Sequence, residues 1–279
     1  MKFDLHTHST MSDGSCTPEE VVQRALDAGL DGIALTDHDA LDGVDVARAY
    51  GEHLGVEVFL GCEVSASWKS DSVHVLGYFM DPENQQLRDE LLMIRDERVA
   101  RAEKMVERLQ GLGVGITMEQ VRAIAKGPSM ARPHVAQALV DLGVVPSTTA
   151  AFTEEWIGDN GRAYVAKRAL TPTEAVRVII EAGGSAVIAH PVWIEREHPG
   201  ESEQLIEECA AAGLAGLEVR HPDQDDEWRA RWSALAQRLG LVQTGSSDFH
   251  GNEHGPIIGV NWADEDTVAE LRARAGGRR

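Results

Sequence analysis

Two histidines near the start of the chain are spaced to share one metal ion. His6 and His8 are two residues apart in a segment that we expect to be extended. Because side chains alternate across a β-strand, both imidazoles project to the same side. That geometry suits two ligands on one divalent ion, but a single histidine is as often a surface or hydrogen-bonded core residue. The pair alone leaves both interpretations open.

Further His, Asp and Glu residues follow short apolar runs along the whole chain. They occur in Ser-Asp-Gly, Thr-Asp-His-Asp, Gly-Cys-Glu, Ala-His-Pro and Ser-Asp-Phe-His segments. Burying so many ionisable groups together is costly unless cations compensate their charge. The set therefore predicts a metal cluster rather than a purely structural polar network. The candidate metal ligands are His6, His8, Asp13, His38, Glu63, His74, His190, Asp248 and His250.

The chemistry of this ligand set limits the metal. It combines imidazole and carboxylate groups without a thiolate, which suits Mn, Fe, Zn or Co better than calcium. We expect two or three divalent ions, with Mn as the first choice and Fe, Zn, Mg or Co as alternatives. Three ions would bring about +6, against about −3 from Asp13, Glu63 and Asp248 and about −1 from a bridging hydroxide. The remaining positive charge matches a phosphate dianion.

The elements that must position these residues alternate between short apolar runs and longer segments of helical period. This pattern is typical of repeated βα units around a parallel sheet or barrel, whose strands all end at one face. Residues about 240 positions apart in the sequence would then meet around one pocket. The predicted strands are Phe3–His6, Gly32–Thr36, Val56–Glu63, Val73–Phe79, Ser185–Ala189, Gly216–Val219 and Val242–Gly245.

The strand signal disappears between about residues 82 and 163. The helices predicted there are Gln85–Gln110, Met118–Ala125, Arg132–Leu142 and Thr149–Trp156. We therefore expect a helical insertion domain at 82–163 and a barrel domain formed by 1–81 and 164–279. Outside the insertion, Thr17 and Thr171 each precede a proline and acidic residues, which predicts two helix N-caps.

Composition and charge exclude several classes of protein. The chain has 279 residues, enough for one large barrel with an insertion. Its formal net charge of −20 argues against tight binding to long nucleic acid. Cys16, Cys62 and Cys209 are widely separated, which predicts neither a disulfide framework nor a thiolate zinc site. Without a secretory leader or a membrane-length apolar run, we expect a cytoplasmic protein with no membrane partner.

The series of motifs from Asp4 to His250 resembles the polymerase and histidinol phosphatase (PHP) family. The resemblance implies an α/β fold, a distorted (β/α)7 barrel with a helical insertion. It also implies three metal positions. His6, His8, Glu63 and Asp248 would hold one ion, with Glu63 bridging to a second ion held by His74 and His190, and with Asp13, His38 and His250 holding a third.

Two segments are similar to one branch of this family. They are Ala-Arg-Pro-His-Val-Ala at 131–136 and Gly-Leu-Glu-Val-Arg-His-Pro at 216–222. That branch hydrolyses nucleoside monophosphates or nucleoside 3′,5′-bisphosphates, and some of its members trim short RNA from the 5′ end. Arg132 is then a candidate phosphate clamp and His134 a second donor. The alternative is that Arg132 only opens a helix whose first turn contains Pro133.

Two more residues are candidates for contact with substrate. Many relatives of the branch continue after Ala-His-Pro with Gly-Arg-Tyr, whereas this chain has Val192-Trp193-Ile194. Trp193 either stacks on a base or is a buried aromatic residue. His221 follows a predicted strand, and it either protonates the leaving group or binds phosphate, or it is a solvent-facing loop histidine.

The predicted function is metal-dependent hydrolysis of a phosphomonoester on a small nucleotide such as AMP or pAp. A metal-bridging hydroxide would attack phosphorus in line, and Asp248 would receive or relay a proton. The alternatives are 5′-to-3′ exonuclease activity on short RNA, hydrolysis of histidinol phosphate or of a carboxamide, and a noncatalytic PHP module. The complete ligand set argues against a noncatalytic module. The charge of −20 and the lack of a basic stripe argue against a nucleic-acid scaffold.

Overall fold

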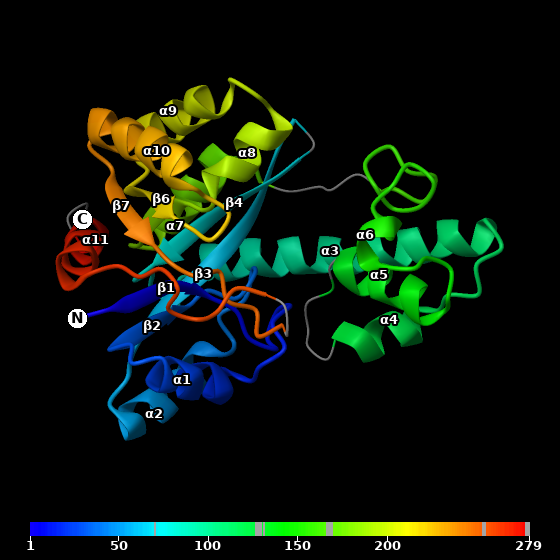
Figure 1. Ribbon diagram of the computed structural model, residues 1–279, viewed down its shortest axis with the longest axis horizontal. Helices are drawn as coiled ribbons and strands as arrows, with labels where there is room; N and C mark the ends of the chain where they lie inside the picture. Colours follow the sequence, from blue (N-terminus) through cyan, green and yellow to red (C-terminus); the bar gives the residue numbers. More distant parts are fainter. Residues whose placement is uncertain (70, 126–129, 131, 166–169, 253–254, 277–279) are drawn as a thin grey trace. The chain divides into compact units, whose positions relative to one another are not determined.

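The computed structural model describes residues 1–69, 71–125, 130, 132–165, 170–252 and 255–276. The chain divides into two compact units, one formed by residues 1–91 and 169–279 and the other by residues 92–168 (Figure 1). The domain bounds expected from the sequence, 82–163 for the insertion, stay a prediction.

The first unit is built around a seven-stranded sheet whose strands follow the order of the sequence. A parallel bridge between Thr7 and Phe249 links the first strand to the segment after the last one, so the sheet curls into a nearly closed barrel. This agrees with the expected distorted (β/α)7 barrel. The strands are β1 (Phe3–Thr7), β2 (Gly32–Leu35), β3 (Glu57–Trp68), β4 (Asp71–Tyr78), β5 (Ser185–Ile188), β6 (Gly216–Arg220) and β7 (Val242–Gly245).

One strand, β4, runs against its neighbours. It pairs antiparallel with both β3 and β5, while the other neighbouring strands pair in parallel. The expectation of an all-parallel barrel is therefore wrong at β4. A short connection joins β3 to β4, and a parallel strand would need a longer crossover. Because β4 is reversed, His74 in its first half lies opposite Ser65 of β3, two residues beyond Glu63.

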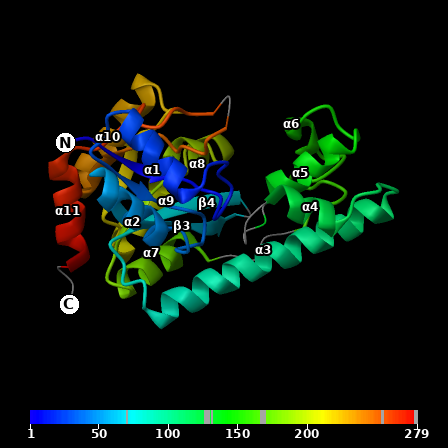
Figure 2. The same ribbon diagram turned by 90° about the horizontal axis from the view of Figure 1, so that it is seen from below.

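Seven helices of the described residues cover this sheet, and two of them begin at the predicted caps. Thr17 and Thr171 each form a capping box with the glutamate three residues later, Glu20 and Glu174. Figure 2 shows α1 and α2 side by side, with α2 next to β3. The helices are α1 (Pro18–Asp27), α2 (Val44–Leu54), α7 (Pro172–Glu181), α8 (Pro191–Glu197), α9 (Ser202–Ala212), α10 (Asp226–Leu239) and α11 (Glu265–Gly276).

An apolar cluster unites the strands with the last helix. Its members include Phe3, Leu5, Ala34, Phe59, Leu76, Tyr78, Val187, Val242, Val268 and Leu271. Val268 and Leu271 belong to α11, which packs against β4, β5 and β7. The three cysteines of the chain are buried and free.

The second unit is helical, with its own apolar core. α3 (Gln85–Gly111) begins in the first unit and continues into the second, which also contains α4 (Met118–Ala125), α5 (Arg132–Asp141) and α6 (Thr148–Ala151). The helix predicted at Thr149–Trp156 is wrong beyond residue 151. The chain turns there, and a Cβ at Gly158 would lie 2.6 Å from the carbonyl carbon of Phe152. Among the described residues, no helix is both long and apolar enough to cross a bilayer.

Candidate metal centre

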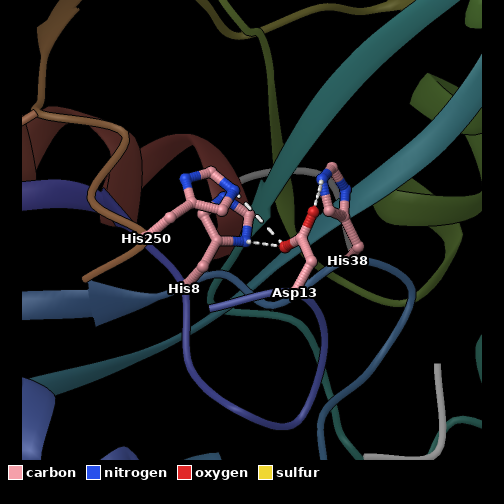
Figure 3. Close-up of side chains that lie close together, drawn as sticks. All are labelled: His8, Asp13, His38 and His250. Carbon is pink, nitrogen blue, oxygen red and sulfur yellow. Dashed lines mark ion pairs between the residues drawn. The ribbon is translucent and has the colours of Figure 1, made fainter. Parts of the chain in front are cut away.

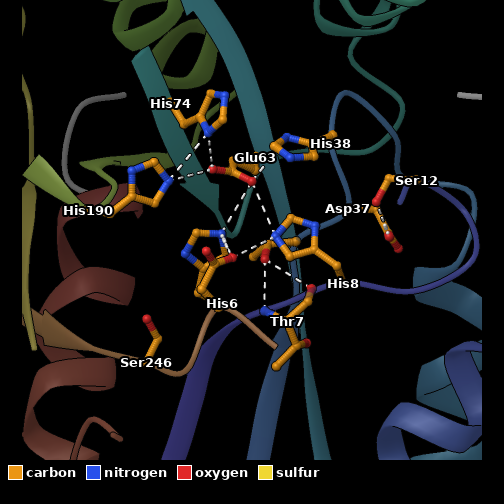
Figure 4. Close-up of polar contacts among 12 residues, drawn as sticks. His6, Thr7, His8, Ser12, Asp37, His38, Glu63, His74, His190 and Ser246 are labelled. Atoms are coloured by element: carbon orange, nitrogen blue, oxygen red, sulfur yellow. Dashed lines mark hydrogen bonds and ion pairs between the residues drawn. The ribbon is translucent and has the colours of Figure 1, made fainter. Parts of the chain in front are cut away.

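Glu63 lies in the middle of a group of histidines, with each carboxylate oxygen facing a different part of the group (Figure 4). The side chain is on β3 and is 1% exposed. Its Oε1 lies 2.7 Å from His74 Nδ1 and 3.2 Å from His190 Nε2. Its Oε2 faces three further ring nitrogens, at 3.3 Å from His6 Nε2, 3.2 Å from His8 Nε2 and 3.0 Å from His38 Nδ1.

Asp248 approaches the same histidines from the segment after β7. Its Oδ1 lies 3.2 Å from His6 Nε2 and 3.3 Å from His8 Nε2. Its Oδ2 lies 3.3 Å from His221 Nε2. Asp248 has a φ of +54°, a left-handed backbone that is rare for a residue with a side chain and is common at functional sites. The two oxygens therefore connect the histidine group to His221.

Asp13 is another carboxylate that faces several histidines. It lies between His38 on one side and a stacked pair of histidines on the other (Figure 3). Its Oδ1 lies 3.3 Å from His250 Nε2 and 3.7 Å from His8 Nδ1, and its Oδ2 lies 3.6 Å from His38 Nε2. The rings of His8 and His250 stack at a centroid distance of 4.1 Å. His8 and His38 each turn one nitrogen toward Asp13 and the other toward Glu63, so both rings lie between these two carboxylates.

The structure brings all nine candidate metal ligands together. Their ligand atoms form groups within 4.8 Å, one made of His6, His8 and Asp248, one of His38, Glu63 and His74, and one of His8, Asp13, His38 and His250. His190 joins the second group through Glu63 and through His74 Nδ1, which lies 3.3 Å from His190 Nε2. The grouping differs from the expected three sets in two ways: His8 and His38 each lie in two groups, and Glu63 lies in the second group but not in the first.

Four buried ring nitrogens at this centre have no hydrogen-bond partner among the described residues. They are His6 Nε2, His8 Nδ1, His8 Nε2 and His38 Nδ1. Each lies close to carboxylate oxygens, yet an unprotonated imidazole nitrogen and a carboxylate are both acceptors and cannot bond to each other. A divalent cation between them would satisfy both, and mixed imidazole and carboxylate ligation is common for such ions. The residues present therefore fit metal ions.

The charges of the cluster are arranged to attract a cation. Burial would raise the pKa of Glu63, but His38 and the other nearby histidines hold it well below its usual range. Burial likewise opposes ionisation of Asp248, and the charge of His6 helps to keep its pKa well below normal. Burial would lower the pKa of His8, but the nearby carboxylates of Asp248 and Glu63 raise it to about 10. The two carboxylates therefore stay ionised and draw positive charge, carried by a proton on a histidine or by a metal ion, into the space between them and the histidines.

Glu218 contacts residues that carry or adjoin the candidate ligands, and it was missed from the sequence alone. This residue of β6 is completely buried. Its Oε1 lies 3.2 Å from His6 Nδ1 and accepts a hydrogen bond from Ser246 Oγ, and its Oε2 accepts one of 2.7 Å from His190 N. Burial would raise its pKa, but the charge and hydrogen bond of His6 lower it to about 2. The available signal was an acid inside the apolar run Gly-Leu-Glu-Val.

Asp37 supports the segment that carries Asp13 and was also missed. Its carboxylate accepts hydrogen bonds from Ser9 N at 2.7 Å, from Ser9 Oγ at 2.7 Å and from Ser12 Oγ at 2.6 Å. Figure 4 shows Asp37 beside Ser12, at the turn after β1. Asp37 is 2% exposed and directly precedes His38 in the Thr-Asp-His-Asp segment. Its position in that segment was the signal that could have identified it.

His221 and Trp193 lie beside the cluster. His221 is 2% exposed, so the alternative of a solvent-facing histidine is wrong. Its Nδ1 accepts a hydrogen bond of 3.1 Å from Asp223 N, which leaves the proton on Nε2, facing Asp248. The Trp193 indole packs on the His190 ring at a centroid distance of 3.9 Å, and its Nε1 donates to Asp223 Oδ2 at 2.7 Å.

Arg132 and His134 belong to α5 in the second unit, and residue 131 of their motif lies outside the described residues. Arg132 begins the helix, and its Nη1 lies 3.0 Å from Asp159 Oδ1. The exposed fraction of the His134 residue is 9%. A second arginine of the unit, Arg101, has its pKa lowered to about 10 by burial and by the positive charge of Arg132. Two neighbouring guanidinium groups form a candidate anion site.

Comparisons with known proteins agree with this geometry. The PHP domain family model matches residues 4–115. A 3′,5′-nucleoside bisphosphate phosphatase of Chromobacterium violaceum is 35% identical over 256 residues, covering 91% of this chain and 88% of that protein. A 5′-3′ exoribonuclease of Haemophilus influenzae is 32% identical over 257 residues, covering 89% of this chain and 90% of that protein.

A solved structure shows the same fold over nearly the whole chain. It is described as a metal-dependent phosphoesterase from Bifidobacterium adolescentis, is 33% identical, and superposes with a TM-score of 0.86 over 98% of this chain and 96% of that one. Identity at this level across the full length, together with the seven-stranded barrel and the clustered His, Asp and Glu residues, decides the assignment. The chain belongs to the PHP family of metal-dependent phosphoesterases.

Proposed function

We propose that the protein hydrolyses a phosphomonoester on a small nucleotide, such as AMP or a nucleoside 3′,5′-bisphosphate like pAp, with two or three divalent ions. Mn is the first choice of metal. The observation that carries the proposal is the convergence of nine His, Asp and Glu side chains, with buried ring nitrogens that lack hydrogen-bond partners in the described part of the chain. A single phosphate dianion suits the positive charge that such a cluster would hold.

The ligands are proposed in three sets that share members. His6, His8, Glu63 and Asp248 form the first set, Glu63, His74 and His190 the second, and Asp13, His38 and His250 the third. When bound, the ions would polarise the phosphate and lower the pKa of water to generate a nucleophile. The protein holds these side chains on strand ends and on loops tied down by Glu218 and Asp37.

Proton transfer is assigned to the pair formed by Asp248 and His221. Asp248 reaches the ligand histidines with Oδ1 and the His221 ring with Oδ2. His221 carries its proton on Nε2 because Nδ1 accepts from Asp223 N. The pair can therefore accept a proton from the attacking water on Asp248 and deliver the Nε2 proton of His221 to the departing alkoxide, after which the proton on Asp248 restores the His221 N–H.

Candidate substrate contacts are proposed within each unit separately. Arg132 supplies a guanidinium fork for a phosphate, with His134 as a second donor and with Arg101 as an additional positive charge. Trp193 offers the face of its indole that does not pack on His190. The bisphosphate substrate in the name of the Chromobacterium violaceum relative supports a site with more than one cationic position.

The experiment that tests this function is phosphate release after reconstitution with Mn²⁺. The panel contains AMP, pAp, histidinol phosphate and a 5′-phosphorylated RNA dinucleotide at equal concentrations. We expect AMP or pAp to give the highest kcat/KM. Hydrolysis of histidinol phosphate in preference to both nucleotides would overturn the nucleotide assignment, and the absence of phosphate release from every substrate would overturn the phosphatase assignment.

A second candidate function is 5′-to-3′ exonuclease activity on short RNA. It is favoured by the Haemophilus influenzae relative, whose name is 5′-3′ exoribonuclease. The same panel distinguishes the two functions, because an exonuclease releases a mononucleotide from the dinucleotide whereas a phosphatase releases only inorganic phosphate. Faster release of mononucleotide than of phosphate from AMP or pAp would make the exonuclease the main activity.

The partner and location follow from charge and cysteine usage. We propose a small phosphorylated substrate rather than long nucleic acid, because the net charge of −20 repels polyanions away from the cluster. We propose a cytoplasmic location, supported by three buried free cysteines, which a reducing compartment keeps reduced.

A further inference from the structure

Glu218 receives contacts from three segments that also carry candidate metal ligands. His6 lies on β1, His190 lies two residues after the end of β5, and Ser246 directly follows β7, two residues before Asp248. These segments are far apart in the sequence, since 212 positions separate His6 from Glu218. A single carboxylate on β6 therefore ties together three strand ends that lie on both sides of it in the sheet.

The contact with His6 orients the imidazole of that residue. Nδ1 lies 3.2 Å from Glu218 Oε1, while Nε2 on the other side of the ring faces Glu63 and Asp248. Ser246 Oγ and His190 N both donate to Glu218, so its two oxygens act as acceptors. An accepting oxygen opposite Nδ1 keeps the proton on that nitrogen. The lone pair of Nε2 then points into the cluster, as a metal ligand requires.

The contact with His190 holds a strained backbone. His190 has a φ of +27°, a value that residues other than glycine rarely adopt. Its N–H donates to Glu218 Oε2 at 2.7 Å. The hydrogen bond keeps the peptide in the conformation that points the His190 ring at Glu63, where Nε2 lies 3.2 Å from Oε1.

We propose that Glu218 is a positioning residue of the metal centre, which selects the Nδ1–H tautomer of His6 and holds the segments of His190 and Asp248 at ligand distance. The proposal rests on the proposed metal-binding function. Glu218 itself does not bind an ion or touch substrate, because its oxygens are engaged by His6, Ser246 and His190. Its effect is to raise the affinity of the centre for metal ions.

The test compares Glu218→Gln with Glu195→Gln. Glutamine keeps the shape of Glu218, but its amide N–H group placed opposite His6 would donate to Nδ1 and move the ring proton to Nε2. Glu195 is also a buried glutamate, and among the described residues its carboxylate contacts Gly200, Ser202 and Arg231, none of which is a candidate ligand. It is the matched control for loss of a buried carboxylate.

The measurement is calorimetric titration of the chelator-treated full-length proteins with Mn²⁺ alone. We expect Glu218→Gln to bind Mn²⁺ about 10- to 100-fold more weakly than wild type. We expect Glu195→Gln to melt at a lower temperature but to bind Mn²⁺ as wild type does. An affinity of Glu218→Gln within about twofold of wild type would overturn the proposal, as would an equal loss in Glu195→Gln.

A second measurement needs no variant at Glu218 and decides the matter if Glu218→Gln fails to fold. In wild-type protein loaded with diamagnetic Zn²⁺, two-bond ¹H–¹⁵N spectra show which ring nitrogen of His6 carries the proton, with His6→Gln used to assign the signals. We expect the proton on Nδ1. A proton on Nε2 would overturn the proposal.

These outcomes are separable from failure of the proposed function. Wild-type protein that releases phosphate but shows no effect of Glu218→Gln on Mn²⁺ affinity would overturn the role of Glu218 and leave the phosphatase assignment intact. Weakened Mn²⁺ binding in Glu218→Gln, with no phosphate release by wild type from any nucleotide, would support Glu218 and overturn the assigned activity.

Discussion

In the proposed mechanism, Asp248 takes part both in binding of metal and in transfer of a proton. One of its oxygens lies within 3.3 Å of the Nε2 atoms of both His6 and His8, and the other lies 3.3 Å from His221 Nε2. Asparagine would keep nearly the same shape but would lose the negative charge, and its N–H group cannot accept a proton. The two roles of this carboxylate are therefore removed together by one substitution.

We expect Asp248→Asn to lower kcat by about 100-fold or more while the protein stays folded. Turnover is measured as phosphate release from the best substrate of the panel, with circular dichroism to check the fold. Asp226→Asn is the matched control, because Asp226 is a fully exposed acid on α10. A well-folded Asp248→Asn protein with near-normal kcat would remove Asp248 from the centre of the reaction.

Arg132 offers a test of substrate recognition by the helical unit. Removal of a charge-assisted phosphate contact in Arg132→Ala should lower kcat/KM by about 30- to 1000-fold, without changing metal content. Arg132→Lys should recover only part of the loss, because an ammonium cannot form the bidentate fork. If the bound group is a second phosphate, the loss should be large for pAp and small for AMP.

The control for this series is Arg122→Ala, an exposed arginine of the same unit that pairs with Glu103. The structure also gives Arg132 a partner in Asp159, so a purely structural role is the competing explanation. Reduced stability of Arg132→Ala with unchanged kinetics in its folded fraction would favour that explanation. The nucleotide assignment would then lose its support from this residue.

At the scale of elements, Glu195 ties three helices together. It lies on α8, accepts hydrogen bonds from Gly200 N at 2.8 Å and from Ser202 Oγ at the start of α9, and pairs with Arg231 of α10 at 3.0 Å. The Arg231 guanidinium also lies over the Trp232 ring. Of these helices, α8 packs against β6 and α10 packs against both β6 and β7, the strands that precede His221 and Asp248. The network therefore stabilises the outer layer behind that side of the centre.

The free energy of unfolding should depend on pH through this glutamate. Burial would raise the pKa of Glu195, but hydrogen bonds from Ser202 and Gly200 and the Arg231 guanidinium lower it below the usual value. Because the pKa is lower in the folded than in the unfolded chain, the carboxylate stabilises the fold above the unfolded pKa. This stabilisation is lost as the pH falls through the folded pKa.

We expect Glu195→Gln to lower the free energy of unfolding by about 1 to 3 kcal/mol at pH 7, and this difference should shrink as the pH falls below about 4. Urea denaturation of metal-free proteins from pH 7 to about pH 3.5 measures it. Glu197→Gln, at an exposed position of the same helix, should change neither value. A pH-independent difference would show that the ionised form of Glu195 is not the stabilising one.

At the scale of the whole molecule, the centre joins segments from both ends of the chain. The candidate ligands run from His6 to His250, and β1 meets the segment after β7 through backbone hydrogen bonds such as His8 N to Phe249 O at 2.8 Å. Ions that bind across these segments are absent from the unfolded chain and stabilise only the folded state. Bound metal should therefore stabilise the folded barrel against unfolding.

Chelation should both abolish phosphate release and lower the melting temperature. An ion present at about 100 times its Kd contributes about 2.7 kcal/mol, which corresponds to a shift of about 5 °C for a chain of this size. Differential scanning calorimetry before and after chelation measures the shift, and Mn²⁺ added back should reverse it. Activity and melting temperature that survive prolonged chelation would contradict the metal-dependent mechanism.

Local signals in the sequence were sufficient to predict which residues form the centre and where most helices and strands lie. Capping boxes at Thr17 and Thr171 involve groups three residues apart, and apolar runs mark strands of only a few residues. Both kinds of signal lie within a short window, so the strands were predicted to within a few residues. The strand ends then indicated which acids and histidines would meet, because the parallel strands of a barrel end at one face.

Only the tertiary structure decided how those residues are held. Reversal of β4 depends on which strands become its neighbours, and the short α6 depends on a turn in which Gly158 packs on the backbone of Phe152. The roles of Glu218 and Asp37 depend on hydrogen bonds to residues 212 and 25 to 28 positions away. Hydrogen bonds between distant segments leave no periodic trace in the sequence, because each partner is specified only when the barrel closes.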